Sequence, residues 1–333
     1  MKLSVGIKNI ISKVSKNLKW IGNDLLFSTG IVNPKLPKSG NCILVYHGID
    51  DGNTKRVNAK FISEKDLKSQ LYWLKTRANI LSTEQIFNES NHDNGFNIAI
   101  TFDDGFANNH KYLLPIVEEL EIPITVFVTT IQLKNENYLW PDAVDLFSIS
   151  GPETIKFKGE NYHKRKNEYV NKHHGRLKSV ITSGGYKSAK EALVLMGFDE
   201  EALQNFPSVL WRMMDASELQ KLAQSPFITI GSHGVCHDSF VKLSADELQV
   251  EIVNSKKYLE DVTGNTIDQI AYPYGHYNDQ IIDAIEATGY KFQFRVDLQK
   301  QHNALDKRVM TRLGINPFIS WGNQVKAIGN GKY

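Results

Sequence analysis

Two adjacent carboxylates, Asp103 and Asp104, follow an apolar run and precede a glycine in residues 98–105 (IAITFDDG). A run of this kind, rich in β-branched residues, is typical of a buried strand, and the glycine marks a turn where the strand ends. Neighbouring strand residues point to opposite sides, so the two acids are expected to do different work. One could bind a metal ion while the other faces a substrate or water. An acidic turn without any chemistry would have the same sequence.

Two histidines follow a second apolar run further along the chain. Residues 228–237 (ITIGSHGVCH) predict a strand that leads into a loop carrying His233 and His237. Imidazole is the commonest neutral metal ligand, and three protein ligands plus water are the usual arrangement of catalytic zinc. Two histidines at this spacing also occur as structural pairs, but a four-residue separation lets both rings reach one ion. Together with the Asp-Asp-Gly turn, the pair predicts one Asp-His-His site.

The elements that must position these residues alternate between strand and helix from residue 41 onward. Strands are predicted over residues 42–46, 97–104, 124–129, 227–232, 269–272, 291–296 and 310–315. Alternation of this kind predicts an α/β fold with a parallel sheet or barrel, and such folds place their chemistry at the carboxyl ends of the strands. Both the acidic turn and the histidine loop follow such ends.

The chain divides into a basic N-terminal segment and linker, residues 1–40, and one large domain, residues 41–333. Within the domain the regular alternation lapses between about residues 133 and 225, which predicts a helical insertion. Insertions at the active end of a fold commonly form lids or substrate walls.

The N-terminal segment has an amphipathic pattern. Its apolar residues recur at helical spacing and its lysines fall on the other side. A basic helix of this kind can lie on an anionic membrane surface, so residues 1–30 are a candidate for peripheral membrane contact. Docking of the same stripe on the protein's own core is the alternative. The interleaved lysines interrupt the apolar centre that a signal peptide needs.

Composition limits the remaining possibilities. The net charge of +2 gives no reason to expect a nucleic-acid partner. Cys42 and Cys236 form neither a CxxC motif nor a disulfide framework, which fits a reducing compartment, so we expect a cytoplasmic protein, peripheral on the membrane if residues 1–30 bind it. No apolar run reaches the roughly 18 residues of a membrane span.

From residue 42 to residue 316 these motifs resemble the polysaccharide deacetylases of the NodB-homology, carbohydrate esterase type. Residues 101–105 (TFDDG) match the first motif of that family letter for letter. Residues 233–237 (HGVCH) match the spacing of its second motif, with Gly234 in place of the usual Ser or Thr. Residues 271–275 (AYPYG) are similar to its third motif in branches that act on surface polysaccharides, and Tyr46-His47 resembles the opening strand of those branches.

The resemblance implies a distorted (β/α) barrel of about seven strands and a metal-dependent removal of acetyl from a sugar. Asp104, His233 and His237 would be the metal ligands, and Asp103 the general base that deprotonates a metal-bound water. One oxygen and two nitrogen ligands suit zinc, and also cobalt or nickel. The remaining candidate residues are assigned to substrate binding: His47, Tyr272, Pro273, Tyr274, Gly275 and Arg312.

Two departures from the family pattern affect the proton transfers. The arginine that often orients the base in the third motif is replaced by Ala271 and Tyr272, and Arg312 could take over that role. The late histidine that usually serves as general acid is missing from the strand ending at Asn316. We expect His276, directly after the third motif, to be the catalytic proton donor, with His302 as an alternative.

The function expected from these residues is that of an N-deacetylase. Its substrate would be an N-acetylated amino sugar in a surface polysaccharide or in the lipid-linked precursor of one. An O-acetyl esterase acting on a glycan is one alternative, and a degenerate glycan-binding module without turnover is another.

Overall fold

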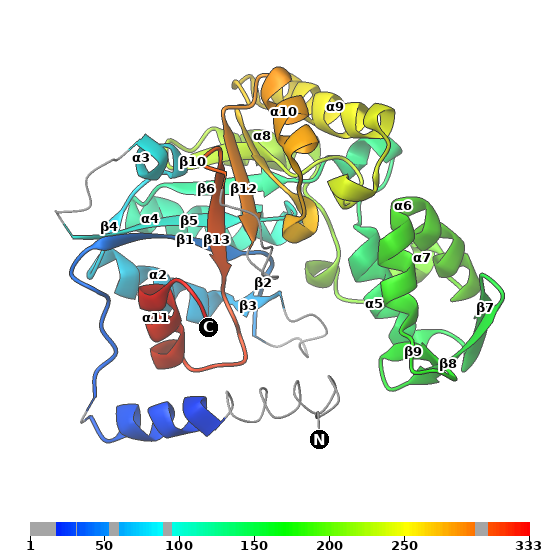
Figure 1. Cartoon of the computed structure of the whole chain (residues 1–333), viewed down its shortest axis with the longest axis horizontal. Helices are drawn as coiled ribbons and strands as arrows, with labels where there is room; N and C mark the ends of the chain where they lie inside the picture. Colours follow the sequence, from blue (N-terminus) through cyan, green and yellow to red (C-terminus); the bar gives the residue numbers. More distant parts are fainter. Residues whose placement is uncertain (1–17, 31, 53–59, 89–94, 297–305) are drawn as a thin grey trace.

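A computed structural model describes residues 18–30, 32–52, 60–88, 95–296 and 306–333. At its centre, seven parallel strands close into a barrel (Figure 1). In order around the barrel they are β1 (Gly40–Tyr46), β5 (Phe96–Phe102), β6 (Ile124–Val128), β10 (Ile228–Ser232), β11 (Gln269–Ala271), β12 (Phe292–Val296) and β13 (Val309–Gly314). Pairing of β1 with both β5 and β13 closes the ring, which confirms the predicted seven-stranded (β/α) barrel.

The barrel is irregular around β5. The two-residue strand β4 (Asn79–Ile80) pairs with the beginning of β5, while β6 pairs with its end. All seven residues of β5 are buried, because both faces of a parallel sheet are covered. Each of the seven predicted strands is present with ends within two residues of its predicted position.

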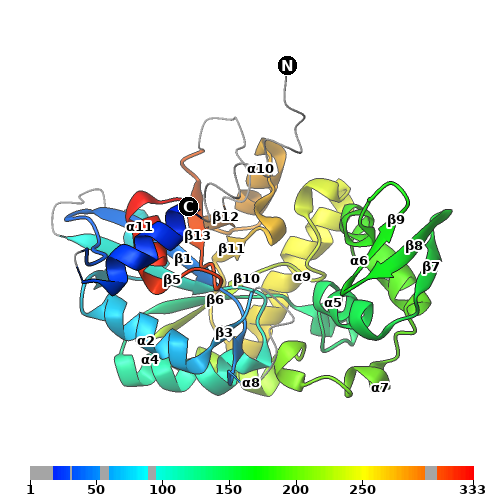
Figure 2. The same ribbon diagram turned by 90° about the horizontal axis from the view of Figure 1, so that it is seen from below.

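Helices surround the barrel on its outside (Figures 1 and 2). They are α2 (Glu64–Lys75), α3 (Thr83–Asn88), α4 (Leu114–Leu120), α8 (Ala216–Ala223), α9 (Ala245–Thr263), α10 (Asp279–Ala287) and α11 (Trp321–Asn330). The longest of them, α9, begins at a capping box in which Ser244 and Glu247 satisfy each other's backbone N–H groups. Its buried residues Leu248, Ile252 and Leu259 join the main hydrophobic core.

The insertion forms a body of its own beside the barrel, drawn in green in Figure 1. It contains α5 (Trp140–Ser150), β7 (Thr154–Phe157), β8 (Glu160–Arg165), β9 (Glu168–Asn171), α6 (Leu177–Leu195) and α7 (Glu200–Leu203). The predicted helical insertion is present, and it also contains an antiparallel sheet of β7, β8 and β9 that was not predicted. Exposed and buried residues alternate in β7, but over four positions only, and Tyr162 is the one buried residue of β8, so neither strand has a pattern long enough to be predicted.

Residues 18–28 form a helix that lies beside α11 (Figures 1 and 2). The side chain of Asn323 donates to the backbone oxygen of Trp20 (3.1 Å) and to Asp24 Oδ1 (2.7 Å), and Phe27 packs over Gly322. The opposite face carries Leu18, Ile21 and Leu25, each about two-thirds exposed. The part of the apolar stripe that the structure describes is therefore not docked on the protein's core, and residues 1–17 lie outside the described residues.

Among the described residues, no helix combines the length and the apolar character that crossing a bilayer requires.

Candidate active site

The two aspartates stand immediately beyond the last residue of β5. The backbone N–H of Asp103 still donates to the oxygen of Tyr46 (3.0 Å), so Asp103 continues the strand geometry. Asp104 then adopts the left-handed conformation, with φ of 76°, and Gly105 follows with φ of 85°. A Cβ on Gly105 would come within 2.8 Å of Val128, so a side chain has no room there. The two carboxylates thus separate because the backbone turns, and not because of strand alternation.

Asp104, His233 and His237 converge on one point at the end of the barrel. Asp104 Oδ1 lies 3.2 Å from His237 Nε2 and 3.7 Å from His233 Nε2, and all three side chains are buried. Their ligand atoms lie within 4.8 Å of one another. Asp104 Oδ1 accepts no well-formed hydrogen bond from the described residues, so it keeps lone pairs that a metal ion could use.

The protonation of His233 also suits a metal ligand. Its Nδ1 lies 2.8 Å from the backbone oxygen of Ala271, which can only accept, so Nδ1 carries the proton and Nε2 the lone pair. Burial lowers the pKa of His233 to about 4, so the ring is neutral at neutral pH. These three residues therefore fit a divalent cation in both donor type and geometry.

Helix α9 fixes the loop that carries both histidines. The buried carboxylate of Glu251 accepts the backbone N–H groups of Val235 (2.6 Å) and Cys236 (3.1 Å). Gly234 has φ of 77°, and a Cβ on it would lie 2.8 Å from Glu251 Oε2. The contact with Glu251 therefore gives a physical reason for the glycine at the position where the family motif usually has Ser or Thr.

The insertion holds the same loop from the other side. Trp140 at the start of α5 donates from Nε1 to the backbone oxygen of Cys236 (3.1 Å). Asp238 accepts the backbone N–H of Tyr186 (2.7 Å) at the point where Gly185, with φ of 62°, interrupts α6. A Cβ on Gly185 would come within 2.7 Å of the Asp238 carboxylate. The insertion is therefore a wall of the site itself.

Asp103 is paired with Arg312 of β13. The guanidinium donates from Nη1 to Asp103 Oδ1 (2.6 Å) and from Nη2 to Oδ2 (2.7 Å), and Nη1 also donates to Thr101 Oγ1 (3.0 Å). Burial alone would raise the pKa of Asp103, but the charge of Arg312 and its hydrogen bonds hold that pKa below its usual value. Asp103 is thus kept as a carboxylate near the metal ligands, its Oδ2 4.0 Å from His233 Nε2.

Residues 90–293 match a family model described as polysaccharide deacetylase, which covers more than half of the chain. The chain belongs to the polysaccharide deacetylase family. It is also 20% identical over 253 residues to the putative polysaccharide deacetylase YxkH of Bacillus subtilis (strain 168). This match covers 75% of the chain but 62% of YxkH, so the chain spans less than two thirds of that relative's length.

Solved structures of polysaccharide deacetylases share the fold. The putative deacetylase BA0330 from Bacillus anthracis is 16% identical, with a TM-score of 0.55 over 87% of this chain and 69% of that one. The Streptococcus pyogenes deacetylase PplD, solved in complex with acetate, is 17% identical, with a TM-score of 0.54 over 88% and 99%. IcaB from Ammonifex degensii is 16% identical, with a TM-score of 0.54 over 89% and 99%.

Arg312 was assigned to substrate binding from the sequence, and its position corrects that assignment. Its side chain is 1% exposed and lies behind Asp103, so a role in binding substrate does not fit. Its bidentate contact fits the other role considered for it, which is that of the arginine that orients the base.

The third motif of this family member contributes one side chain to the site. The ring of Tyr274 lies 4.9 Å from that of His237 and also faces Trp140. Tyr272 is buried, bonds through its hydroxyl to Gln293 and stacks on Tyr277, so its predicted contact with substrate does not fit its position. Pro273 and Gly275 are also buried and form the turn that presents Tyr274.

The structure describes two further histidines that were predicted to act in the site, His47 and His276. His47 follows β1. Burial lowers its pKa, while the charges of Asp104 and Asp103 act in the opposite direction. His276 is half-buried, with Nδ1 3.0 Å from Ser239 Oγ and its ring stacked beside Tyr274. Burial and Lys242 lower its pKa, which reduces the protonated fraction at neutral pH. Its role as proton donor stays a prediction, and His302 lies outside the described residues.

Lys60 is a site residue that sequence reasoning missed. Its Nζ lies 2.8 Å from Asp104 Oδ2 and 3.5 Å from Asp142 Oδ1. Burial works against its charge, but the two carboxylates hold its pKa above the usual value, so it remains a cation. It precedes β3 (Ile62–Ser63) and belongs to no motif or periodic pattern that could have identified it.

We expect His237→Ala to lose the divalent ion while the fold persists, because one of the three ligands is removed. Asp103→Asn is the matched control: it also alters a buried polar side chain of the site, but it should keep the ion. Isothermal titration with zinc, together with circular dichroism, measures both effects. Full binding by His237→Ala, or loss of binding by Asp103→Asn, would contradict the assignment of ligands.

We expect Arg312→Met to shift the acid limb of the kcat/KM profile to higher pH. Without the guanidinium, burial dominates and raises the pKa of Asp103, so the base is protonated at a higher pH than in the wild type. Breaking this buried pair should also lower the free energy of unfolding by about 3–5 kcal/mol. The pH profile of acetate release measures the shift, with Arg312→Lys as the charge-preserving control. An unmoved acid limb in Arg312→Met would show that Asp103 is not the titrating base.

Proposed function

We propose that the protein is a metal-dependent hydrolase that removes the N-acetyl group from an amino sugar of a surface polysaccharide or of its lipid-linked precursor. The observation that carries the proposal is the buried Asp104–His233–His237 cluster beside a separate carboxylate, Asp103, that Arg312 keeps ionised. The fold is also shared with a de-N-acetylase from Aggregatibacter actinomycetemcomitans, at 17% identity and a TM-score of 0.51.

The residues of the site divide the work of amide hydrolysis. When bound to Asp104, His233 and His237, a divalent ion, which we expect to be zinc, would supply Lewis-acid polarisation of a carbonyl and a lowered pKa for water. Asp103 can accept a proton, because Arg312 orients both of its oxygens and keeps it ionised. Tyr274, which is partly exposed beside His237, can pack against a sugar ring, and the buried Trp140 supports it from behind.

Acetate release from paired substrates tests this function. We expect the zinc-loaded protein to release acetate from N-acetylglucosamine oligomers, and Asp103→Asn to be slower by on the order of 10² or more. Release from O-acetylated sugars alone would identify an esterase instead. Binding of zinc and glycan without any release would identify a binding module.

We further propose that the protein acts at the cytoplasmic face of a membrane, where a lipid-linked sugar would be found. The support is the helix at residues 18–28, which uses its polar face and Phe27 for α11 and leaves Leu18, Ile21 and Leu25 exposed. The sequence adds lysines at positions 2, 8, 13, 16 and 19, which would favour anionic lipid. Both cysteines are free, as is usual in a reducing compartment.

We expect replacement of Leu18, Ile21 and Leu25 by serine to reduce co-sedimentation with phosphatidylglycerol vesicles, because the apolar face that would enter the bilayer is lost. Val194→Ser is the matched control, since Val194 is equally exposed but lies on α6. Binding should also weaken as salt is raised. Unchanged binding by the triple variant would contradict membrane contact through this helix.

A further inference from the structure

Each of the two neighbouring aspartates of the site is paired with one cation, but the two pairings differ. Arg312 engages both oxygens of Asp103, at 2.6 and 2.7 Å. Lys60 engages a single oxygen of Asp104, since its Nζ lies 2.8 Å from Oδ2. The other oxygen, Oδ1, accepts no well-formed hydrogen bond from the described residues and faces the Nε2 atoms of both histidines of the site. The two cations therefore leave Oδ1 of Asp104 as the carboxylate oxygen that is open to an ion.

The insertion helps to fix Lys60 in this place. The Nζ of Lys60 also lies 3.5 Å from Oδ1 of Asp142, a buried carboxylate in the first turn of α5. From the same turn, Trp140 donates to the backbone oxygen of Cys236 (3.1 Å), in the loop that carries both histidines. One helical turn of the insertion thus supports both the cation beside Asp104 and the loop that holds the other two metal ligands.

The number of oxygens that Asp104 offers decides how much of the ion stays accessible. A carboxylate can bind a metal ion through one oxygen or through both. With both oxygens bound, it would occupy two positions around the ion, whereas catalytic metal sites keep a position open. Lys60 opposes the two-oxygen mode because it donates to Oδ2. Its charge also repels a divalent ion on the same carboxylate, and burial of Asp104 limits the screening by water.

We propose that Lys60 is a positioning residue of the metal centre. It confines Asp104 to one ligand oxygen, lowers the affinity of the site for the ion, and keeps one more position open for water and the substrate carbonyl. Asp142 brings this control into the insertion, because it draws part of the charge of Lys60 away from Asp104. The inference rests on the metal dependence in the proposed function, and it assigns no proton transfer to Lys60.

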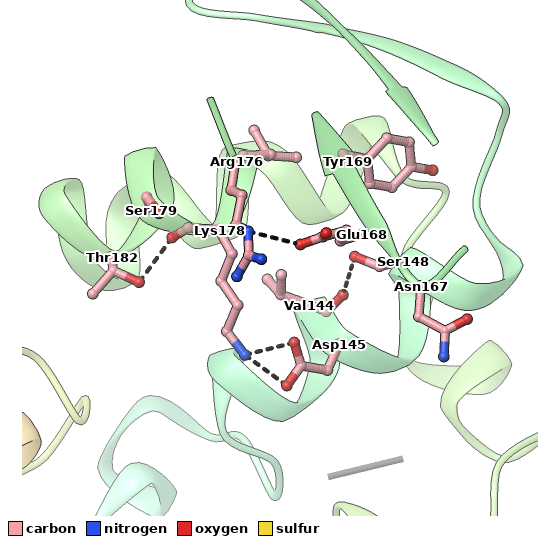
Figure 3. Close-up of a pocket in the computed structure, with 11 residues that line it drawn as sticks. Val144, Asp145, Ser148, Asn167, Glu168, Tyr169, Arg176, Lys178, Ser179 and Thr182 are labelled. Atoms are coloured by element: carbon pink, nitrogen blue, oxygen red, sulfur yellow. Dashed lines mark hydrogen bonds and ion pairs between the residues drawn. The ribbon is translucent and has the colours of Figure 1, made fainter. Parts of the chain in front are cut away.

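A second lysine offers a matched control. Lys178 of α6 also pairs with an aspartate of α5, with its Nζ 2.5 and 2.6 Å from the two oxygens of Asp145 (Figure 3). The Lys178 side chain is 46% exposed, so water screens its charge, and the pocket that it lines contains none of the metal ligands. Lys178→Met therefore removes a lysine paired with α5 without altering the surroundings of Asp104.

Direct measurement of zinc binding tests the proposal without requiring turnover. By isothermal titration of the full chain, we expect Lys60→Met to bind zinc at least about tenfold more tightly than the wild type, because a repulsive charge is removed. Lys60→Gln should also bind more tightly, and it covers the case in which Lys60→Met does not fold. Asp142→Asn should bind more weakly, since it leaves Lys60 to Asp104 alone. Lys178→Met should bind as the wild type does.

The visible spectrum of the cobalt-loaded protein reports the coordination itself. Four-coordinate cobalt absorbs more strongly than five-coordinate cobalt, so release of Asp104 Oδ2 should weaken these bands in Lys60→Met. Lys60→Gln keeps an amide that can donate to Oδ2, and its spectrum should resemble that of the wild type.

The outcomes separate this inference from the proposed function. Unchanged or weaker zinc binding by both Lys60 variants would overturn the inference, as would an equal gain in Lys178→Met. A cobalt spectrum that Lys60→Met leaves unchanged would overturn the restriction to one oxygen. Absence of metal binding in the wild type and all variants would contradict the ligand assignment and the inference together. The expected metal affinities without any acetate release would contradict the proposed hydrolase alone.

Discussion

Three carboxylates, Asp103, Asp104 and Asp142, are buried together at the carboxyl end of the barrel, and the rest of the site depends on how their charges are compensated. Removing a carboxylate from water is costly unless it is paired. Arg312 pairs with Asp103, and Lys60 stands between Asp104 and Asp142. Burial raises the pKa of Asp142, so this carboxyl group is the most readily protonated of the three. Asp104, which also faces the Nε2 atoms of His233 and His237, is the carboxylate best placed to receive a metal ion.

Because Arg312 pairs with Asp103 while the histidines face Asp104, the two neighbouring aspartates have separate roles. The left-handed turn at Asp104 and Gly105 directs one carboxylate to the histidines and leaves the other against Arg312. A left-handed backbone recurs at His237 and Tyr274, two further residues of the site. Such conformations are unfavourable for residues with a side chain and persist where the surroundings fix them. The tight packing of Gly105 against Val128 and the hydrogen bonds that Glu251 accepts from Val235 and Cys236 provide that support.

The insertion extends the same site in two directions. Through Trp140 and the break in α6 at Gly185 it fixes the loop that carries His233 and His237. Through Asp142 of α5 it also reaches Lys60, the cation that contacts Asp104. A segment that interrupts the regular alternation of the chain thus becomes part of the catalytic end of the barrel, so changes within it should affect the geometry of the metal ligands.

The sequence by itself determined the seven strands of the barrel, the acidic turn and the spacing of the two histidines. These features are local, because burial of a strand, a turn and a pair of ligands four residues apart each leave a pattern within a few neighbouring residues. Only the tertiary structure decided that Arg312 supports Asp103 across 209 positions, that Lys60 faces Asp104, and that Tyr272 points inward while Tyr274 faces the site. It also decided which face of the helix at residues 18–28 is free. Each of these depends on single side chains that meet across long separations in the sequence, and a single residue leaves no periodic pattern from which its partner could be predicted.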